Sequence, residues 1–519
     1  MDVISAWGIR INRYSFVTKH KVLSPALILG VVLGYFALLL VIAFYTARGA
    51  TNETFFIGQK SSKWYLVAYG MIGTSLSGVT FMSVPGNVGA NHFTYLLFVT
   101  GNMLGYIIIA SVLLPLYYRL NLTSIYGYLQ SRFGNVAYKT GASFFLVSRW
   151  LGASIRIFLV LNVLQVFMLD GWKIPFPVTV FVILAMILLY TFKGGVKTIV
   201  WTDTLQTTFM VLALIITIFI IRTELNMSFT DLFVSLSQKG YTQVFDTNWR
   251  SKSFFAKQII SGMFIAITVT GLDQEMMQKN ISVRTLGDAQ KNMLVFSGVF
   301  VVVNALFLFM GGLLYLYLAS KNMAMPAHAD DVFPTIALRY LSPVAALVFV
   351  VGLVSALFPS ADGAMTALTS SFCIDILGLQ QRSNLSEEQK TDVRRKVHVS
   401  VAFAFLIAII LFRVFSNGSV ITTAFKIAGY TYGPLLGLFT FGIFSKRNVT
   451  DRLVPVVCIL SPAITYLLDR FSTNLFFGYQ MGFEALLVNG LMTFAGLSII
   501  SNNNLPTNNI SSTPDFIIK

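Results

Sequence analysis

Thirteen apolar stretches, each long enough to cross about 30 Å of hydrocarbon, run through this sequence of 519 residues. Such a succession folds only with lipid as its solvent, because a water-soluble fold has too little polar surface to cover it. The composition agrees, since 55% of the residues are hydrophobic and 11% are charged, whereas soluble domains carry about 25% charged residues. We therefore predict an all-α polytopic membrane protein with spans near residues 25–46, 64–88, 94–117, 138–168, 174–192, 198–222, 254–278, 293–319, 343–375, 398–416, 420–444, 453–469 and 480–500.

The spans form one transmembrane domain over residues 25–500, with no soluble catalytic domain. The longest connection, about 223–253, contains an amphipathic stretch and predicts a helix or lid outside the membrane. We expect residues 1–24 to be an extracytoplasmic N-terminal segment. Residues 501–519 are rich in Asn, Ser and Pro and are expected to form a disordered cytoplasmic tail.

The net charge of +16 comes from basic residues in the short gaps between spans rather than from a continuous basic stripe. This distribution is typical of cytoplasmic loops that obey the positive-inside rule, and it argues against nucleic-acid binding. An outside N-terminus and a cytoplasmic C-terminus place most loop cations inside, among them Lys279, Arg394, Arg395 and Lys396. The basic segment before the first span opposes this orientation, but the loops carry more of the charge.

Ionisable side chains within membrane spans are rare and usually functional. Four stand out in this sequence: Arg149 and Arg156 in span 138–168, Asp203 in span 198–222, and Asp362 in span 343–375. The two arginines are two helical turns apart and share a face. Their partner is either a carboxylate, Asp203 or Asp362, or an anionic or hydroxylated substrate.

Span 343–375 carries a polar stripe at helical spacing. A stripe of hydroxyls around a mid-membrane carboxylate offers the oxygen ligands that hard cations prefer. The alternative is hydrogen bonding between helices, which is common for small polar residues in membrane bundles. The stripe consists of Ser355, Pro359, Asp362, Thr366 and Thr369. Its proline leaves a backbone carbonyl without a hydrogen-bond partner in the helix.

Span 64–88 is dense in Gly, Ser and Thr and contains Pro85. We expect this helix to break in the middle of the membrane, where freed backbone groups bind a substrate or an ion. Close packing of small residues against neighbouring helices is the alternative explanation.

The chain resembles the sodium:solute symporter family, whose members carry sugars, sialic acid, proline, vitamins or iodide. The resemblance implies a LeuT-type core of two inverted five-helix repeats, at about 64–222 and 254–444, with extra helices at 25–46, 453–469 and 480–500. It rests on six segments in family order: TSLSGVTFMSVPG (74–86), PLYYRLNLTSIYGYLQSRFG (115–134), GGVKTIVWTDTLQ (194–206), TGLDQEMMQKN (270–280), SADGAMTALTSSF (360–372) and YTYGPLLGLF (430–439).

The same resemblance implies binding residues. A sodium site would use the carbonyls of Gly73, Leu76 and Ala356 and the hydroxyl of Ser360, although the adjacent hydroxyl position is Pro359 here. A further sodium site in some members pairs the carboxylate matching Asp203 with serines matching 362 and 363, which are Asp362 and Gly363 in this chain. Substrate contacts would come from the broken helix and from one of the two arginines, which gives the set Ser75, Ser77, Thr80, Arg149 and Arg156.

These features predict sodium-coupled symport of a small polar solute by alternating access, with sodium as the only metal and no cofactor. A sugar, an acidic sugar or another small organic solute fits the pattern, and we expect a monomer in a bacterial inner membrane. Proton coupling through Asp203 or Asp362 is the main alternative, and a membrane-embedded solute sensor is a second. An enzyme is not expected, because no catalytic motif is present. For Asp362 two hypotheses remain: a sodium ligand, or the partner of Arg156.

Overall fold

The computed structural model describes residues 25–46, 55, 62–415 and 420–502; side chains at 25, 193–197 and 415–422 are not described. Most of the predicted N-terminal segment and tail therefore lies outside the described residues. The first two residues of the predicted tail, Ser501–Asn502 (β2), pair antiparallel with Asn448–Val449 (β1).

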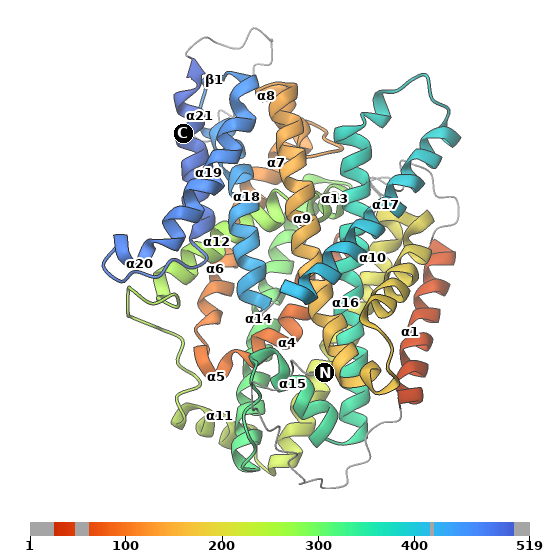
Figure 1. Cartoon of the computed structure of the whole chain (residues 1–519), viewed down its shortest axis with the longest axis vertical. Coiled ribbons are helices and arrows are strands. Elements are labelled where there is room, and N and C mark those ends of the chain that lie inside the picture. The colour runs from red at the N-terminus through yellow and green to blue at the C-terminus, as the bar shows by residue number, and fades with distance from the viewer. Residues whose placement is uncertain (1–24, 47–54, 56–61, 416–419, 503–519) are drawn as a thin grey trace, which may run out of the picture.

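The described chain is a bundle of helices (Figure 1). The helices are α1 (Pro25–Thr46), α3 (Trp64–Ser75), α4 (Gly78–Gly86), α5 (Val88–Asn91), α6 (Tyr95–Ile108), α7 (Leu114–Arg119), α8 (Gly127–Arg132), α9 (Asn135–Leu164), α10 (Phe176–Leu225), α11 (Phe229–Gln238), α12 (Phe255–Ala266), α13 (Gln274–Ile281), α14 (Leu286–Ser320), α15 (Val332–Thr335), α16 (Pro343–Ser371), α17 (Glu387–Phe415), α18 (Val420–Phe444), α19 (Val454–Arg470), α20 (Ser472–Leu475) and α21 (Ala485–Ile499).

Each predicted span lies in a helix or a pair of helices, and the spans 174–192 and 198–222 both lie in the single helix α10. In the described part of the chain, nine helices are long and apolar enough to cross a membrane, and two bent pairs bring that number to eleven. The shorter apolar helices 176–192 and 485–499 account for two further predicted spans, the first of them within α10. Helix boundaries differ most at α17, which begins at Glu387, well before the predicted span 398–416, because its first turns are polar and continue the helix beyond the apolar window. The helix α14 likewise begins at Leu286, before the predicted span 293–319.

The amphipathic stretch between spans 198–222 and 254–278 is helix α11. Ser228 and Asp231 cap its start in both directions: the Ser228 hydroxyl accepts from the Asp231 N–H at 3.1 Å, and the Asp231 carboxylate accepts from the Ser228 N–H at 3.2 Å. Such a capping box satisfies two backbone donors that a helix start otherwise leaves unpaired. Figure 1 places α11 at one end of the bundle, opposite to α8 and β1.

Two bent helix pairs occupy the interior of the bundle. The α3–α4 pair packs against α10, α14 and α16, and α13 packs against α3, α14 and α16. The helix α1 lies at one edge and the helices α19, α20 and α21 at the opposite edge (Figure 1). Both bent pairs thus lie in a core that α1, α19, α20 and α21 flank.

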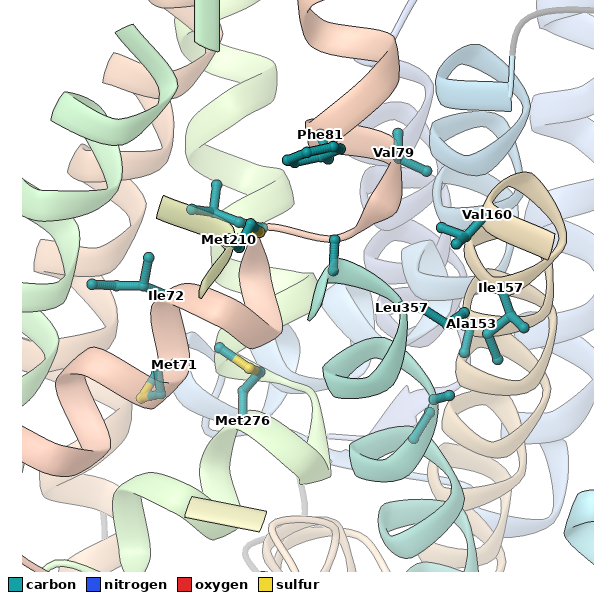
Figure 2. Close-up of a cluster of buried hydrophobic side chains, with 14 of the residues drawn as sticks. Met71, Ile72, Val79, Phe81, Ala153, Ile157, Val160, Met210, Met276 and Leu357 are labelled. Carbon is teal, nitrogen blue, oxygen red and sulfur yellow. The ribbon is translucent and has the colours of Figure 1, made fainter. Parts of the chain in front are cut away.

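The break between α3 and α4 is packed in apolar side chains of these two half-helices and of α9, α10, α13 and α16 (Figure 2). Gly78, the first residue of α4, lies so close to α9 that a Cβ would overlap a methyl group of Val160. A larger residue at 78 would therefore push the half-helix away from α9. The surrounding apolar residues are Met71, Ile72, Val79, Phe81, Ala153, Ile157, Val160, Met210, Met276 and Leu357.

Candidate functional site

The first broken helix is the one that the sequence predicts. The helices α3 and α4 form a single crossing that bends by 56°. Leu76 has φ −88° and ψ 86°, and Ser77 has φ −83° and ψ 178°, so neither residue continues the helix. The break removes intrahelical partners from nearby backbone groups, which leaves them available to a ligand.

A second broken helix was not predicted. The helix α12, extended by a π-helical turn at Ile267–Gly271, meets α13 at an angle of 67°. Lys279, predicted to lie in a loop, is instead within α13, so that prediction is wrong, and the predicted span 254–278 contains a break that was not expected. Charges at the end of an apolar window ordinarily mark the membrane surface, whereas here they belong to a buried half-helix whose eight residues are all buried.

Side chains satisfy the backbone at this second break. The Asp273 carboxylate caps α13 by accepting from the N–H groups of Glu275 and Met276 at 3.0 and 3.3 Å. On the other side of the break, the Tyr117 hydroxyl donates to the Gly271 carbonyl at 2.8 Å, and Tyr126 donates to that of Leu272 at 2.9 Å. The local signal that could have revealed this helix start is an Asp followed by acidic and amide side chains.

A buried network of charges joins the two broken helices. Lys279 on α13 forms ion pairs with Asp203 on α10 at 2.7 Å and with Glu275 at 3.3 Å. Glu275 also pairs with Arg149 on α9, and Arg149 lies 3.7 Å from the carboxylate of Asp273. All five side chains are at most 4% exposed. Burial of these charges is tolerable only because each carries partners of opposite sign.

The network corrects the predicted partner of Arg149. Asp203 or Asp362 was the expected carboxylate partner, but Arg149 pairs with Glu275 and Asp273. Asp203 is instead bound by Lys279, and it also accepts from the Thr74 hydroxyl at 3.0 Å. The pairing depends on the second break, which turns α13 toward α9 and α10.

Asp362 lies fully buried on α16. Its carboxylate accepts from the Tyr190 hydroxyl on α10 at 2.6 Å and from the N–H of Gly363 at 2.6 Å. Among the described residues, Asp362 has no ion pair, so the hypothesis that it is the partner of Arg156 is wrong. Its role as a sodium ligand stays a prediction.

A cavity of about 100 Å³ lies beside the first break. All five predicted substrate residues, Ser75, Ser77, Thr80, Arg149 and Arg156, are on its wall. Their presence on one wall follows from the break, which turns α4 toward α9. Further polar and aromatic groups line the cavity from α6, α12 and α18, including Tyr95, Phe98, Asn102, Tyr106, Thr270 and Phe425.

The two arginines of α9 differ in their surroundings. Arg149 is neutralised by the ionic network, whereas Arg156 has no carboxylate within 4.0 Å among the described residues. Its side chain is partly accessible and borders the cavity. A cation in this position is available to an anionic group of a bound solute.

The residues predicted for the first sodium site lie on packed elements. Gly73 and Leu76 flank the end of α3, and α16 packs against both α3 and α4. On α16, the Ser360 hydroxyl lies 3.5 Å from the Ala356 carbonyl, within the same helical turn. Pro359 is inside α16 and does not interrupt it. The structure thus brings the two helices together, and coordination by these four residues stays a prediction.

Two discontinuous helices that meet at a polar cavity inside a membrane bundle define a secondary active transporter. Residues 55–451 match the sodium:solute symporter family, and the chain belongs to that family. It is therefore a sodium-coupled solute symporter, and its relatives are transporters rather than enzymes.

Three characterised relatives illustrate the similarity. The chain is 25% identical to the sodium/sialic acid symporter SiaT of Proteus mirabilis (strain HI4320), over 89% of this chain and 94% of that protein. It is 23% identical to the sodium/sialic acid symporter NanT of Aliivibrio fischeri (strain ATCC 700601 / ES114), over 88% and 91%. It is 28% identical to the sodium-coupled monocarboxylate transporter 1 of Mus musculus, over 84% and 70%.

The fold is also that of a solved structure of a Na+-coupled sialic acid symporter in a substrate-bound outward-open state. The two superpose with a TM-score of 0.79 over 92% of this chain and 99% of that chain, at 21% sequence identity. At that identity the superposition establishes the fold, which is the predicted LeuT-type fold, and the binding residues have to be argued from this chain itself.

Proposed function

We propose that this protein couples sodium entry to uptake of a small carboxylate-bearing solute, with an acidic sugar of the sialic acid type as the preferred substrate. The observation that carries the proposal is Arg156, a cation on the cavity wall without a carboxylate partner among the described residues. Two of the relatives are sialic acid symporters, which supports an acidic sugar as the substrate.

The rest of the cavity suits a hydroxylated ring. Hydroxyl and amide groups of Ser77, Thr80 and Asn102 offer donors and acceptors to sugar hydroxyls. Phe98 and Phe425 form an aromatic pair at the wall, with ring centroids 5.2 Å apart. A pocket with a few placed polar groups and an apolar remainder is typical of small-molecule sites.

Sodium would bind at the contact of the first broken helix with α16, through the carbonyls of Gly73, Leu76 and Ala356 and the hydroxyl of Ser360. Four oxygens are few for a hard cation, and water or the solute completes such a shell. An ion shared by two helices favours the conformation in which they are together, which also shapes the solute site. This shared preference couples the two ligands.

The proposed location is the bacterial inner membrane, with the N-terminus outside and the C-terminus in the cytoplasm. Basic residues concentrate where β1 and the start of α19 lie, including Lys446, Arg447 and Arg452, and the positive-inside rule assigns that end to the cytoplasm. In this orientation the membrane potential drives sodium inward with about 2.3 kcal/mol per charge per 100 mV. We expect a monomer to be sufficient for transport, because the proposed sodium site and the solute cavity lie within one chain.

Uptake by the purified protein in proteoliposomes tests the proposal. An inward sodium gradient should drive accumulation of radiolabelled sialic acid, and unlabelled glucose should not compete. Arg156→Leu removes a charge-assisted hydrogen bond worth about 1.5–3 kcal/mol, so the half-saturating solute concentration should rise about 10- to 150-fold. Arg284→Leu, at an exposed arginine between α13 and α14, is the matched control and should behave as the parent.

Other outcomes identify the alternatives. Preferred uptake of lactate over sialic acid would assign the cavity to short monocarboxylates, whereas uptake of glucose unaffected by Arg156→Leu would refute an anionic substrate. Full uptake driven by a pH gradient without sodium would indicate proton coupling. Solute-dependent thermal stabilisation without any uptake would indicate a sensor.

A further inference from the structure

The Lys279 ammonium group lies among oxygen atoms from three helices. Its Nζ is 2.6 Å from the Thr74 hydroxyl on α3, 2.7 Å from the Asp203 carboxylate on α10 and 3.3 Å from that of Glu275 on α13. The Lys279 side chain is 3% exposed and that of Asp203 is fully buried. A small monovalent cation at this point would find the same oxygen ligands.

The absence of a side chain at Gly363 leaves the space in which the Glu275 carboxylate lies. A Cβ at residue 363 would lie 2.5 Å from Cδ of Glu275 and would overlap its Oε1. The Glu275 carboxylate therefore occupies the space that any side chain at 363 would need, and it directs Oε1 toward Lys279. A hydroxyl at 363 and the present position of Glu275 exclude each other.

The charges of the network indicate what Lys279 does. Three carboxylates, those of Asp203, Asp273 and Glu275, face two cations, Lys279 and Arg149, so the network already keeps one net negative charge. Without Lys279, the Asp203 carboxylate would keep only the Thr74 hydroxyl as a partner. A buried carboxylate in that state recruits a cation from solution or becomes protonated.

We infer that Lys279 is a tethered cation that replaces a second coupling sodium ion at Asp203. The protein then binds one sodium per transport cycle, at the site proposed between α3–α4 and α16, and the Lys279 side chain stays at Asp203 throughout. The stoichiometry part rests on that proposed site, whereas the replacement at Asp203 stands on the Lys279 contacts alone.

Sodium counting on the purified full-length protein tests the inference. Equilibrium binding of radioactive sodium, without solute, should give one ion per parent chain. Lys279→Met, which keeps the length of the side chain and removes its charge, should bind one ion more than the parent. Adding Asp203→Asn to Lys279→Met should abolish that extra ion. Lys291→Met is the matched control, since Lys291 lies over the Trp64 ring at 4.4 Å on the surface of α14, and it should leave the count unchanged.

Four results bear on the inference. A parent that binds two ions and loses one with Asp203→Asn overturns the inference, even if Lys279→Met does not fold. A folded Lys279→Met with the count of the parent also overturns it. Proton release on sodium binding that is lost in Lys279→Met would show that Lys279 titrates in the cycle and is no permanent cation. A count of zero in the parent and one in Lys279→Met would support Lys279 but refute the first sodium site.

Discussion

Gly363→Ala would add a Cβ in the space that the Glu275 carboxylate occupies. The Cβ would lie 2.5 Å from Cδ of Glu275, whereas carbon atoms in contact prefer about 3.5–4.0 Å. The Glu275 carboxylate would have to retreat by about 1 Å. Its ion pair with Lys279 is already 3.3 Å long, so this movement breaks it, and the contact with Arg149 is displaced at the same time.

The cost follows from the burial of these groups. Breaking a buried ion pair costs about 3–5 kcal/mol, because a charge is left without a partner. Replacing a helical glycine by alanine returns about 0.5–1 kcal/mol. The free energy of unfolding should therefore fall by about 2–4 kcal/mol. Equilibrium unfolding in mixed micelles with increasing dodecyl sulfate, followed by circular dichroism, measures this change.

Two comparisons isolate the cause. Gly298→Ala on α14 adds a Cβ with no atom within 4 Å, so it should stabilise the protein slightly. In a Glu275→Ala background the space beside residue 363 is empty, and Gly363→Ala should then also be neutral or slightly stabilising. The double-mutant cycle should give a coupling of about 2 kcal/mol or more. Equal costs of Gly363→Ala in both backgrounds would refute the argument that Glu275 occupies the space beside 363.

Three further predictions address the ion site, the buried carboxylate and the cavity wall. Ser360→Ala should raise the sodium concentration for half-maximal uptake without changing expression, and an unchanged sodium titration would remove Ser360 from the ion site. Tyr190→Phe deletes the hydrogen bond to Asp362 and should lower the free energy of unfolding by about 1–3 kcal/mol, measured in the same micelle assay. Phe98→Ala opens the wall where its ring meets Phe425 at 5.2 Å, so thermal stabilisation by sialic acid should weaken while stabilisation by sodium alone persists.

The sequence predicts much of this fold because membrane spans are a local property. Twenty or so apolar residues identify a helix without knowledge of its neighbours, and the Gly-, Ser- and Thr-rich segment around Leu76 identifies the first break. The hydroxyl residues of the broken helix were predicted from the family resemblance, and the two arginines of α9 also from their charge within a span. The structure places all five on one cavity.

The sequence did not predict the ionic network, because its ion pairs join residues that are far apart in the chain. Lys279 follows an apolar window and resembles a residue at the membrane surface, and only its contact with Asp203, far away in sequence, reveals that it is buried. Arg149 was recognised as needing a partner, but Glu275 was not considered because it lay in a segment read as the end of a span. A charge inside a span should therefore prompt a search for countercharges at the apparent ends of other spans.

The position of the network along the chain also bears on how the protein enters the membrane. An Asp or Lys at the centre of a span costs about 2.5–3.5 kcal/mol on insertion scales, so the segment with Asp273 and Lys279 is a poor candidate for insertion by itself. Its countercharges, Arg149 and Asp203, lie on helices that the ribosome makes earlier. Because synthesis proceeds from the N-terminus, α9 and α10 are made before α13. The later segment can therefore insert next to Arg149 and Asp203, which neutralise the charges of Asp273 and Lys279.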